Sequence, residues 1–194
     1  MKNKPFVIGI SGGTCSGKST LSVKLKEILN AQYSVIVLHL DRYYVPTFPT
    51  IAPFTGIEYP EHNHPDCMNL EWIHKDLNAV LANSECDIVI IEGLFALYFD
   101  CIRDKLDLKV FVDLMADERM FRRIKRWVDK QPMDEIAARY LDTVRYRHAE
   151  FIEPTRWHAD VVVNGTLDTN LGTEILVSYI KSQISEVKKC KQNV

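Results

Sequence analysis

Short apolar runs recur along the chain, and most are separated by stretches in which apolar residues return every three or four positions. The runs are rich in β-branched residues and end at turn or charged residues, which is typical of strands buried on both faces of a parallel sheet. They cover residues 6–10, 34–40, 87–91, 108–112 and 160–163. The intervening patterns predict helices at residues 18–30, 69–82, 116–129 and 133–149, followed by a last helix at 171–188.

Strands that alternate with helices predict an α/β fold. We expect a five-stranded parallel sheet flanked by helices on both faces, which gives three layers. A chain of 194 residues is long enough to bury one substantial core, and we expect residues 1–194 to form a single domain.

One stretch interrupts the alternation of strands and helices. Five of the eight prolines lie between residues 41 and 70, and five aromatic residues are interleaved with them. A long irregular segment inside a compact domain is usually functional or disordered. Because the aromatic side chains can pack, we expect residues 42–69 to form a substrate-binding flap rather than a disordered insert.

A glycine-rich segment directly follows the first predicted strand and opens the first predicted helix. It fits the pattern G-x-x-x-x-G-K-[ST] and comprises Gly12, Gly13, Thr14, Cys15, Ser16, Gly17, Lys18, Ser19 and Thr20. In this context the backbone N–H groups and the helix N-terminus converge on phosphate oxygens. Lys18 is expected to reach the β- and γ-phosphates of ATP, and the Ser19 hydroxyl to ligate Mg²⁺. We call residues 12–20 the phosphate loop. The sequence thus predicts a P-loop NTPase-type fold, with a plain glycine-rich turn as the alternative.

Two carboxylates follow predicted strands. Asp41 comes after the second strand and Glu92 after the third. Because ligands of open α/β sheets bind at the carboxyl ends of the strands, both side chains should face the phosphate loop. Glu92 suits a Mg²⁺ ligand beside Ser19, and Asp41 suits a base for an acceptor hydroxyl. Either could instead cap the turn that follows it. Asp113, after the fourth strand, is expected to be structural.

The predicted helix at 116–129 carries four arginines at three- and four-residue steps, on one face: Arg119, Arg122, Arg123 and Arg126. A separate apolar face comprises Met120, Ile124, Trp127 and Val128. The arginines could form a solvated basic face, a cluster that closes over a triphosphate, or a nucleic-acid patch that no other basic cluster supports. We expect Arg123 or Arg126 to contact phosphate or substrate.

Residues 62–66 hold two histidines two positions apart, with Asn63 between them and Asp66 after Pro65. This is a weak indication of a metal site, and we expect part of the segment to contact substrate instead. His148 and His158 are expected to be ordinary, partly exposed residues.

Composition narrows the class of protein. The net charge of -2 and pI of about 6.3 argue against a dedicated nucleic-acid binder. The five cysteines are scattered without a C-x-x-C pair, which indicates reduced thiols in a cytoplasmic protein. No apolar run approaches the length that would cross a membrane.

Taken in this order, the motifs resemble the uridine kinase family, within the group that includes phosphoribulokinase and nicotinamide riboside kinases. The matching segments span nearly the whole chain and comprise residues 8–20, 41–44, 64–66, 91–94, 111–113, 122–126, 151–155 and 159–163. The phosphate loop is shared by many enzymes, whereas the other segments at these spacings are much more specific to the group.

The resemblance implies an ATP-dependent kinase that phosphorylates the 5′-hydroxyl of a nucleoside, with ATP and Mg²⁺ as cofactors. It implies Asp41 as the catalytic base, with Lys18 and Arg123 also in catalytic roles. Ser19 and Glu92 would lie at Mg²⁺. Arg126 would lie near the phosphates, and residues 164–166 near the adenine. The substrate contacts that it implies are Tyr44, Asn63, His64, Asp66 and Arg123.

The chain departs from the uridine kinase pattern where the family reads the base and ribose. Asn63 stands where the family usually has an acid that meets the ribose hydroxyls. Residues 81–86 run almost directly into the third strand, in place of a base-covering hairpin. Residues 129–133 lack the usual Arg-Gly-Arg step, so we expect residues 119–133 to form a reduced lid. Pyrimidine specificity therefore stays open.

Several alternatives remain at this point. The acceptor could be nicotinamide riboside, a sugar phosphate or another small alcohol. A GTPase-type switch would need a guanine-reading Asn/Thr-Lys-x-Asp element, which the sequence lacks. A non-catalytic nucleotide-binding module would keep the loop without turnover. The expected partner is a small molecule rather than nucleic acid or membrane, and a homo-oligomer would suit the family.

Overall fold

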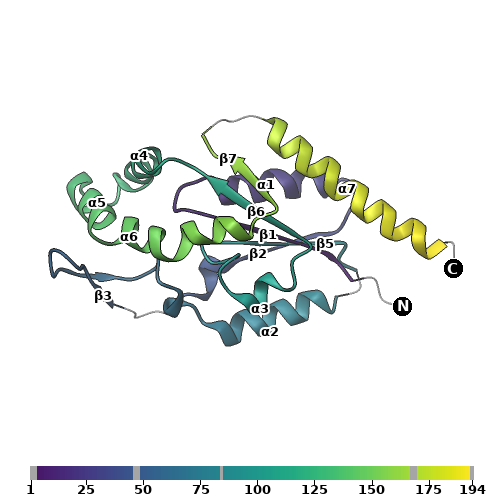
Figure 1. The fold of residues 1–194 in the computed structure, drawn as a ribbon, viewed down its shortest axis with the longest axis horizontal. Coiled ribbons are helices and arrows are strands. Elements are labelled where there is room, and N and C mark those ends of the chain that lie inside the picture. The colour runs from purple at the N-terminus through teal and green to yellow at the C-terminus, as the bar shows by residue number, and fades with distance from the viewer. Residues whose placement is uncertain (1–3, 46–48, 84, 167–169, 193–194) are drawn as a thin grey trace.

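The computed structural model describes residues 4–45, 49–83, 85–166 and 170–192 (Figure 1). All five predicted strands are present and pair in parallel, in the order β2-β5-β1-β6-β7. Their bounds are β1 (Phe6–Gly12), β2 (Val35–His39), β5 (Ile88–Glu92), β6 (Leu108–Asp113) and β7 (Val161–Asn164). The predicted five-stranded parallel sheet is confirmed, and its carboxyl ends share one edge.

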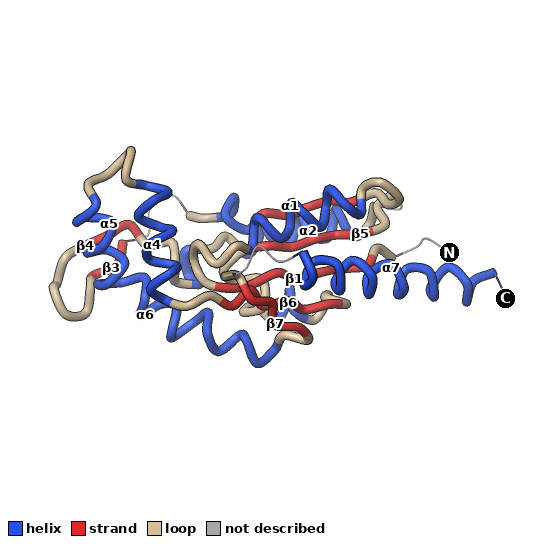
Figure 2. The backbone as a smooth tube through the Cα atoms, turned by 90° about the horizontal axis from the view of Figure 1, so that it is seen from above, coloured by secondary structure: helices blue, strands red, loops and turns tan. Residues whose placement is uncertain are grey.

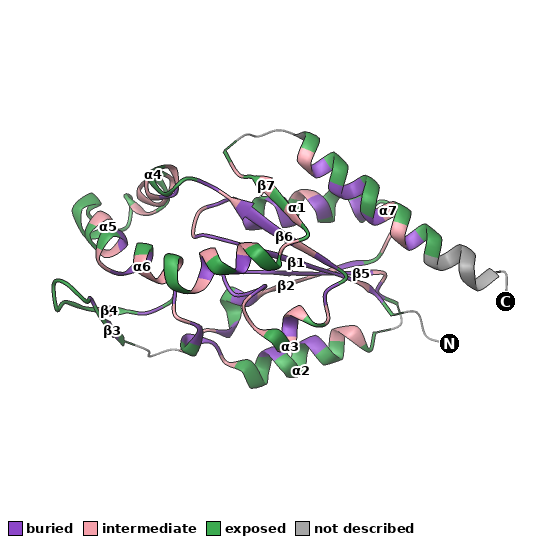
Figure 3. Cartoon of the chain, viewed as in Figure 1, coloured by how far each residue is buried: buried purple, intermediate pink, exposed green. Residues whose placement is uncertain are grey.

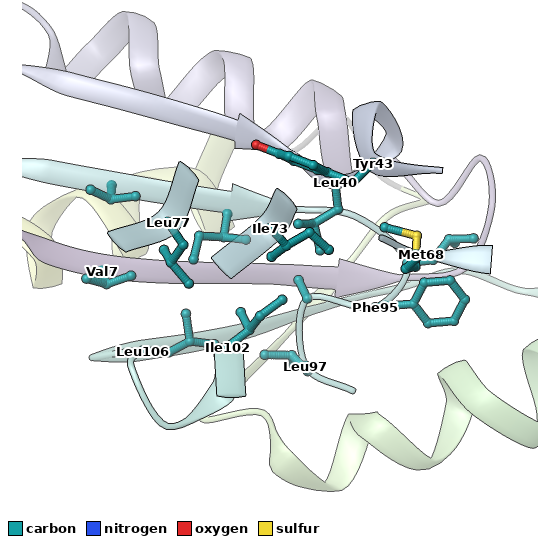
Figure 4. Packing of buried hydrophobic residues seen from close by; sticks show 14 of the residues in the cluster. Val7, Leu40, Tyr43, Met68, Ile73, Leu77, Phe95, Leu97, Ile102 and Leu106 are labelled. Atoms are coloured by element: carbon teal, nitrogen blue, oxygen red, sulfur yellow. The ribbon is translucent and has the colours of Figure 1, made fainter. Parts of the chain in front are cut away.

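Helices cover both faces of the sheet, as predicted. On one face α1 (Lys18–Leu29) and α7 (Asn170–Gln192) bury Leu25 and Ile180 against strand residues such as Ile8. On the other face, α2 (Leu70–Leu81) and α3 (Asp100–Arg103) pack on a second cluster (Figure 4).

In this second cluster, Ile73 and Leu77 of α2 and Ile102 of α3 are almost fully buried, as is Val7 of β1 (Figure 4). The two apolar clusters hold the strands in place between the helices. They thereby position the residues that follow each strand.

The proline-rich segment at 42–69 contains a small sheet that the sequence did not predict. Strands β3 (Pro49–Ile51) and β4 (Glu58–Pro60) pair antiparallel, and this hairpin lies at the same end of the molecule as α5 and α6 (Figure 2). Tyr59 and Thr55 donate hydrogen bonds of 2.8 and 3.0 Å to the carboxylate of Asp142. The hairpin is thus attached to the helical region at 133–152.

That helical region is longer and less regular than the predicted helix at 133–149. It begins with α5 (Met133–Arg139), continues through a π-helical turn at Tyr140–Val144 and α6 (Arg145–Arg147), and ends in a second π-helical turn at His148–Ile152. A 3-10 segment, Glu153–His158, follows. π-Helical turns redirect side chains within a helix and often occur at functional sites.

Helix α4 (Ala116–Trp127) lies largely at the surface, and its residues are mostly exposed or half-buried (Figure 3). Its predicted apolar face is half-buried at Met120, Ile124 and Trp127. The buried residue of this helix is Arg119, which is only 4% exposed. The arginine face is therefore partly buried rather than wholly solvated.

Within the described residues, no helix combines the length and the apolar composition that crossing a membrane requires.

Candidate active site

The phosphate loop joins β1 to α1 and depends on backbone conformations that glycine allows. Gly12 and Gly17 have φ angles of 144° and 106°, and Cys15 has a positive φ of 58°. A Cβ on Gly12 would lie 2.4 Å from the Val112 carbonyl oxygen, and one on Gly13 would lie 2.6 Å from Arg119 Nη1. The loop thus packs closely against β6 at Gly12 and against the guanidinium of Arg119 at Gly13.

Lys18, at the start of α1, bends back over the phosphate loop. Its Nζ donates a hydrogen bond of 2.9 Å to the Gly13 carbonyl oxygen, and the residue is buried. Burial lowers the pKa of Lys18, while the negative charges of Glu92 and Asp41 act in the opposite direction. The ammonium group therefore lies within electrostatic reach of both carboxylates predicted for the site.

Glu92 lies next to Ser19. The Ser19 hydroxyl lies 3.2 Å from each carboxylate oxygen of Glu92, whose side chain is only 5% exposed. His39 Nδ1 lies 2.7 Å from Glu92 Oε1. The sheet register explains this contact, because His39 of β2 is the direct partner of Glu92 in β5. His39 was not predicted as a site residue, because its place beside Glu92 depends on the pairing of β2 with β5.

The Ser19 hydroxyl and the Glu92 carboxylate fit a Mg²⁺ site. Both offer hard oxygen ligands close together, as Mg²⁺ requires. Within the described ranges, no three His, Cys, Asp or Glu residues gather as a self-sufficient metal site. Such a site suits an ion that takes its remaining ligands from water and phosphate.

Asp41 lies in the 3-10 turn Leu40–Tyr43 that follows β2, and Tyr44 comes directly after this turn. Both residues line the same cleft as Lys18 and Ser19. The Tyr44 hydroxyl donates a long hydrogen bond of 3.5 Å to Asp41 Oδ1. Burial, followed by the charge of Asp41, raises the pKa of Tyr44 well above its ordinary value. Tyr44 therefore stays protonated and can act as a hydrogen-bond donor.

Three arginines of α4 line the cleft. Arg123 Nη1 donates to the Thr14 hydroxyl at 3.3 Å, and Arg122 Nη2 donates to the Gly165 carbonyl oxygen at 3.0 Å. Arg126 lines the same cleft. Burial and the nearby charge of Arg139 lower the pKa of Arg123, and its Nε is buried with no hydrogen-bond partner in the described structure. This orphaned donor fits an anion.

The cleft between these walls has a volume of about 470 Å³. It brings together the phosphate loop, Asp41, Tyr44, Asn63 and the arginines, as the sequence predicts. Three further residues of the lining were not predicted as site residues: Leu94, Trp127 and Arg139. His62 also lines the cleft and belongs to the segment 62–66, part of which was expected to contact substrate.

His64 and Asp66 lie beside the cleft rather than in its lining. The His64 ring contacts the Phe151 ring edge-on, with 4.6 Å between the ring centroids, and its Nδ1 accepts from the Asp66 backbone N–H. The Asp66 side chain is 71% exposed. Among the described residues, neither of the two lines the cleft, so their role in substrate binding stays a prediction.

A second hollow of about 290 Å³ adjoins the loop on its other side. Gly17, Thr20 and Arg122 line both spaces. The lining of this second hollow also includes Asn164, Gly165 and Thr166, the residues that the resemblance to uridine kinases implies near the adenine. A Cβ on Gly165 would lie 2.2 Å from the Ser16 carbonyl oxygen, so this turn packs tightly on the loop.

His148 is partly exposed, as expected, but it lies close to charged residues of the site. Its side chain is only 14% exposed, and burial together with the positive charges of Arg119 and Lys18 lowers its pKa to about 4. Its Nε2 lies 3.1 Å from Glu153 Oε2. The π-helical turn at His148–Ile152 thus begins with an imidazole near the site. Asp113 is structural as expected, in an ion pair of 3.1 Å with Arg156.

Comparison with known proteins identifies the family. The model of the phosphoribulokinase/uridine kinase family matches residues 58–171, more than half of the chain. The chain belongs to this family. A uridine kinase of Chlamydia pneumoniae is 32% identical, over 92% of this chain and 90% of its own length. A uridine kinase of Staphylococcus epidermidis is 31% identical, over 95% and 99%.

Solved structures of the family share its fold. Phosphoribulokinase from Rhodobacter spheroides superposes with a TM-score of 0.60 at 12% identity, over 83% of this chain and 70% of that chain. The family match does not depend on the phosphate loop, because the matched range begins at residue 58. This range includes Glu92, the arginines of α4 and the turn at 164–166. The protein is therefore a kinase of the phosphoribulokinase/uridine kinase family.

Proposed function

We propose that this family member transfers the γ-phosphoryl group of ATP to the 5′-hydroxyl of a ribonucleoside. The observation that carries the proposal is that Lys18, Ser19 and Asp41 line one cleft, with Glu92 directly behind it against the Ser19 hydroxyl. Glu92 and Asp41 come from two neighbouring strands, and both act electrostatically on Lys18. Uridine kinases that align over nearly the whole chain support the choice of acceptor.

The phosphate loop and the arginines would hold the triphosphate. Lys18 would exchange its hydrogen bond with the Gly13 carbonyl for phosphate oxygens, and Arg123 would direct its unpartnered Nε to the same group. Arg126 lines the cleft beside Arg123 and adds a third positive charge. Ser19 and Glu92 would hold Mg²⁺, which when bound neutralises charge on the β- and γ-phosphates. Catalysis would arise mostly from positioning and charge neutralisation.

Asp41 is the proposed base. Its carboxylate would accept or orient the proton of the acceptor hydroxyl while the bond from that oxygen to the γ-phosphorus forms. The bond from the γ-phosphorus to the β–γ bridging oxygen would break in the same step, and ADP would leave with that oxygen. Tyr44 and Asn63 would contact the acceptor, since both line the same cleft as Asp41. His64 and Asp66 would act beside this cleft.

The organisation of the chain is part of the same proposal. Residues 1–194 would act as one kinase domain, with residues 42–69 as the substrate-binding flap and residues 119–133 as the reduced lid. The attachment of the hairpin at Asp142 supports a folded flap. The scattered cysteines support a cytoplasmic protein, and its partner would be a small molecule. Assembly as a homo-oligomer is proposed from the family alone.

A sugar phosphate is the second candidate acceptor, and Arg139 is the residue that favours it. Its guanidinium lines the cleft on the flap side, donates to the Pro60 carbonyl oxygen and lies 3.3 Å from His62 Nδ1. Its Nε is buried without a hydrogen-bond partner among the described residues. A cation in this position fits an anionic group on the acceptor.

An ADP-release panel separates the candidates. Uridine, cytidine, other nucleosides, nicotinamide riboside, ribulose 5-phosphate and pantothenate are each offered with ATP and Mg²⁺. We expect the highest kcat/KM with a ribonucleoside, and Arg139→Gln should leave that value within about threefold. A sugar phosphate as the best acceptor, with a loss of tenfold or more in Arg139→Gln, would establish the second candidate. No acceptor-dependent ADP release would contradict both.

A further inference from the structure

Glu61 is a carboxylate buried inside the flap, and both of its carboxylate oxygens have polar partners. Its side chain is 1% exposed. Its Oε1 accepts hydrogen bonds from the backbone N–H groups of His62 and Asn63, at 2.9 and 2.6 Å. A charge buried this deeply costs several kcal/mol unless it is paired, so the fold must provide partners for it. Both partner residues line the cleft.

Arg147 supplies the opposite charge from a distant part of the chain. Its Nε lies 3.3 Å from Glu61 Oε2, and its Nη2 donates to the Thr50 hydroxyl at 3.1 Å. Its Nη1 donates to Glu150 at 2.9 Å on the solvent side. One guanidinium thus connects β3 of the hairpin, the segment at 61–63 and α6. Of the two carboxylate oxygens of Glu61, Oε2 contacts Arg147, and Oε1 contacts the residues that line the cleft.

The side chain of Asn63 is oriented by the same carboxylate. Asn63 Nδ2 donates to Glu61 Oε1 at 3.4 Å, and the residue is only 7% exposed. A side-chain amide has one donor end and one acceptor end. With the donor end directed at Glu61, the carbonyl oxygen is the end that remains for a ligand in the cleft. The neighbouring His62 ring contacts the Tyr44 ring edge-on, with 5.2 Å between the centroids.

We infer that Glu61, held in place by Arg147, is a positioning residue that fixes Asn63 with its carbonyl oxygen available to a hydroxyl group of the acceptor. The identity of that acceptor rests on the proposed function. Asn63 thereby offers a neutral hydrogen-bond acceptor to the cleft. The negatively charged carboxylate of Glu61 stays buried behind Asn63 and paired with Arg147. Glu61 itself touches neither ATP nor acceptor, because it does not line the cleft.

Steady-state kinetics of the full chain test this role, with the best acceptor of the panel. In Glu61→Gln the acceptor KM should rise about tenfold, the effect of one hydrogen bond, because the amide of Asn63 loses its fixed orientation. The KM for ATP and kcat should stay within about twofold. Glu150→Gln is the matched control, since it removes the solvent-side partner of Arg147 and leaves Glu61 paired.

A double-mutant cycle identifies the route of the effect. If Glu61 acts through Asn63, the change Glu61→Gln should have less than about a twofold effect on acceptor KM in an Asn63→Ala background. A merely structural Glu61 would lower the thermal midpoint, and its effects on KM would add to those of Asn63→Ala. An unchanged acceptor KM in Glu61→Gln, or additivity in the cycle, would overturn the inference.

A spectroscopic measurement keeps the inference testable even if no acceptor is turned over. The side-chain NH₂ resonances of Asn63, identified by their loss in Asn63→Ala, should exchange slowly with solvent in the wild type and at least tenfold faster in Glu61→Gln. If Glu61→Gln does not fold, Arg147→Lys provides the second variant, with a smaller acceleration. Equal exchange in variant and wild type would overturn the inference, whereas absent turnover would contradict only the proposed function.

Discussion

Ser19, in the first turn of α1, and Glu92, the last residue of β5, meet although 73 positions separate them, with 3.2 Å from the serine hydroxyl to each carboxylate oxygen. The contact places one oxygen from the phosphate loop and one carboxylate at the same point. His39 lies 2.7 Å from the same carboxylate and restricts its orientation. This cluster would bring Mg²⁺ to the phosphates held by the loop.

The first prediction concerns the Mg²⁺ requirement. Ser19→Ala should raise the Mg²⁺ concentration for half-maximal activity about tenfold, because one oxygen ligand is lost. Glu92→Gln should raise it further, because the charge is lost as well. Mg²⁺ titrations at saturating ATP measure both. Ser185→Ala, on the exposed face of α7, is the control. A Mg²⁺ dependence equal to that of the wild type in both variants would remove Ser19 and Glu92 from the metal site.

Lys18 should dominate binding of the triphosphate. Lys18→Ala removes a charge-assisted contact in a buried position, which is worth about 1.5–3 kcal/mol, so ATP affinity should fall about 10- to 100-fold and turnover with it. Calorimetric titration with a non-hydrolysable ATP analogue measures the affinity. Lys26→Ala changes an exposed lysine on the same helix and should bind as the wild type does. Equal affinities for all three proteins would refute the assignment of the loop.

The buried imidazole of His148 should make stability depend on pH. Its pKa in the folded protein, about 4, lies below the ordinary value of 6.5, so the unfolded chain takes up a proton first as the pH falls. Stability should therefore be full above pH 6.5 and decline between pH 6.5 and pH 4, by about 3 kcal/mol in total.

Denaturant unfolding at several pH values measures this dependence. The difference between wild type and His148→Phe isolates the contribution of His148, because the variant cannot take up the proton. His158→Gln changes an exposed histidine and should follow the wild type. Parallel pH profiles for wild type and His148→Phe would show that His148 is not held neutral in the folded protein.

The parts of this structure that could be predicted are those set by nearby sequence. Each strand is a largely apolar run, and the phosphate loop follows one of them directly, so both were evident. Asp41 and Glu92 could be placed together because parallel strands bring their carboxyl ends to one edge. His39 could be placed beside Glu92 only once the strand order was known, because the contact depends on the pairing of β2 with β5.

The parts that could not be predicted depend on contacts between distant segments. The pairing of β3 with β4 involves three-residue strands, too short for a periodic pattern. Arg119 was grouped with the other arginines by spacing, yet it packs against Gly13 while its neighbours line the cleft. Glu61 was overlooked because its partner Arg147 lies 86 positions away. Burial of charged groups was therefore the main source of error.

Asp41 provides the most direct test of the central claim, which is transfer of phosphoryl from ATP to an acceptor hydroxyl at this cleft. The measurement follows ³²P from γ-labelled ATP into the acceptor, at saturating ATP, in the wild type, Asp41→Asn and the exposed control Asp134→Asn. We predict acceptor-dependent formation of a labelled nucleoside 5′-monophosphate, lost about 10²- to 10⁴-fold in Asp41→Asn alone, with ATP affinity retained. Equal rates of labelling in Asp41→Asn and the wild type, or label appearing only as inorganic phosphate, would contradict it.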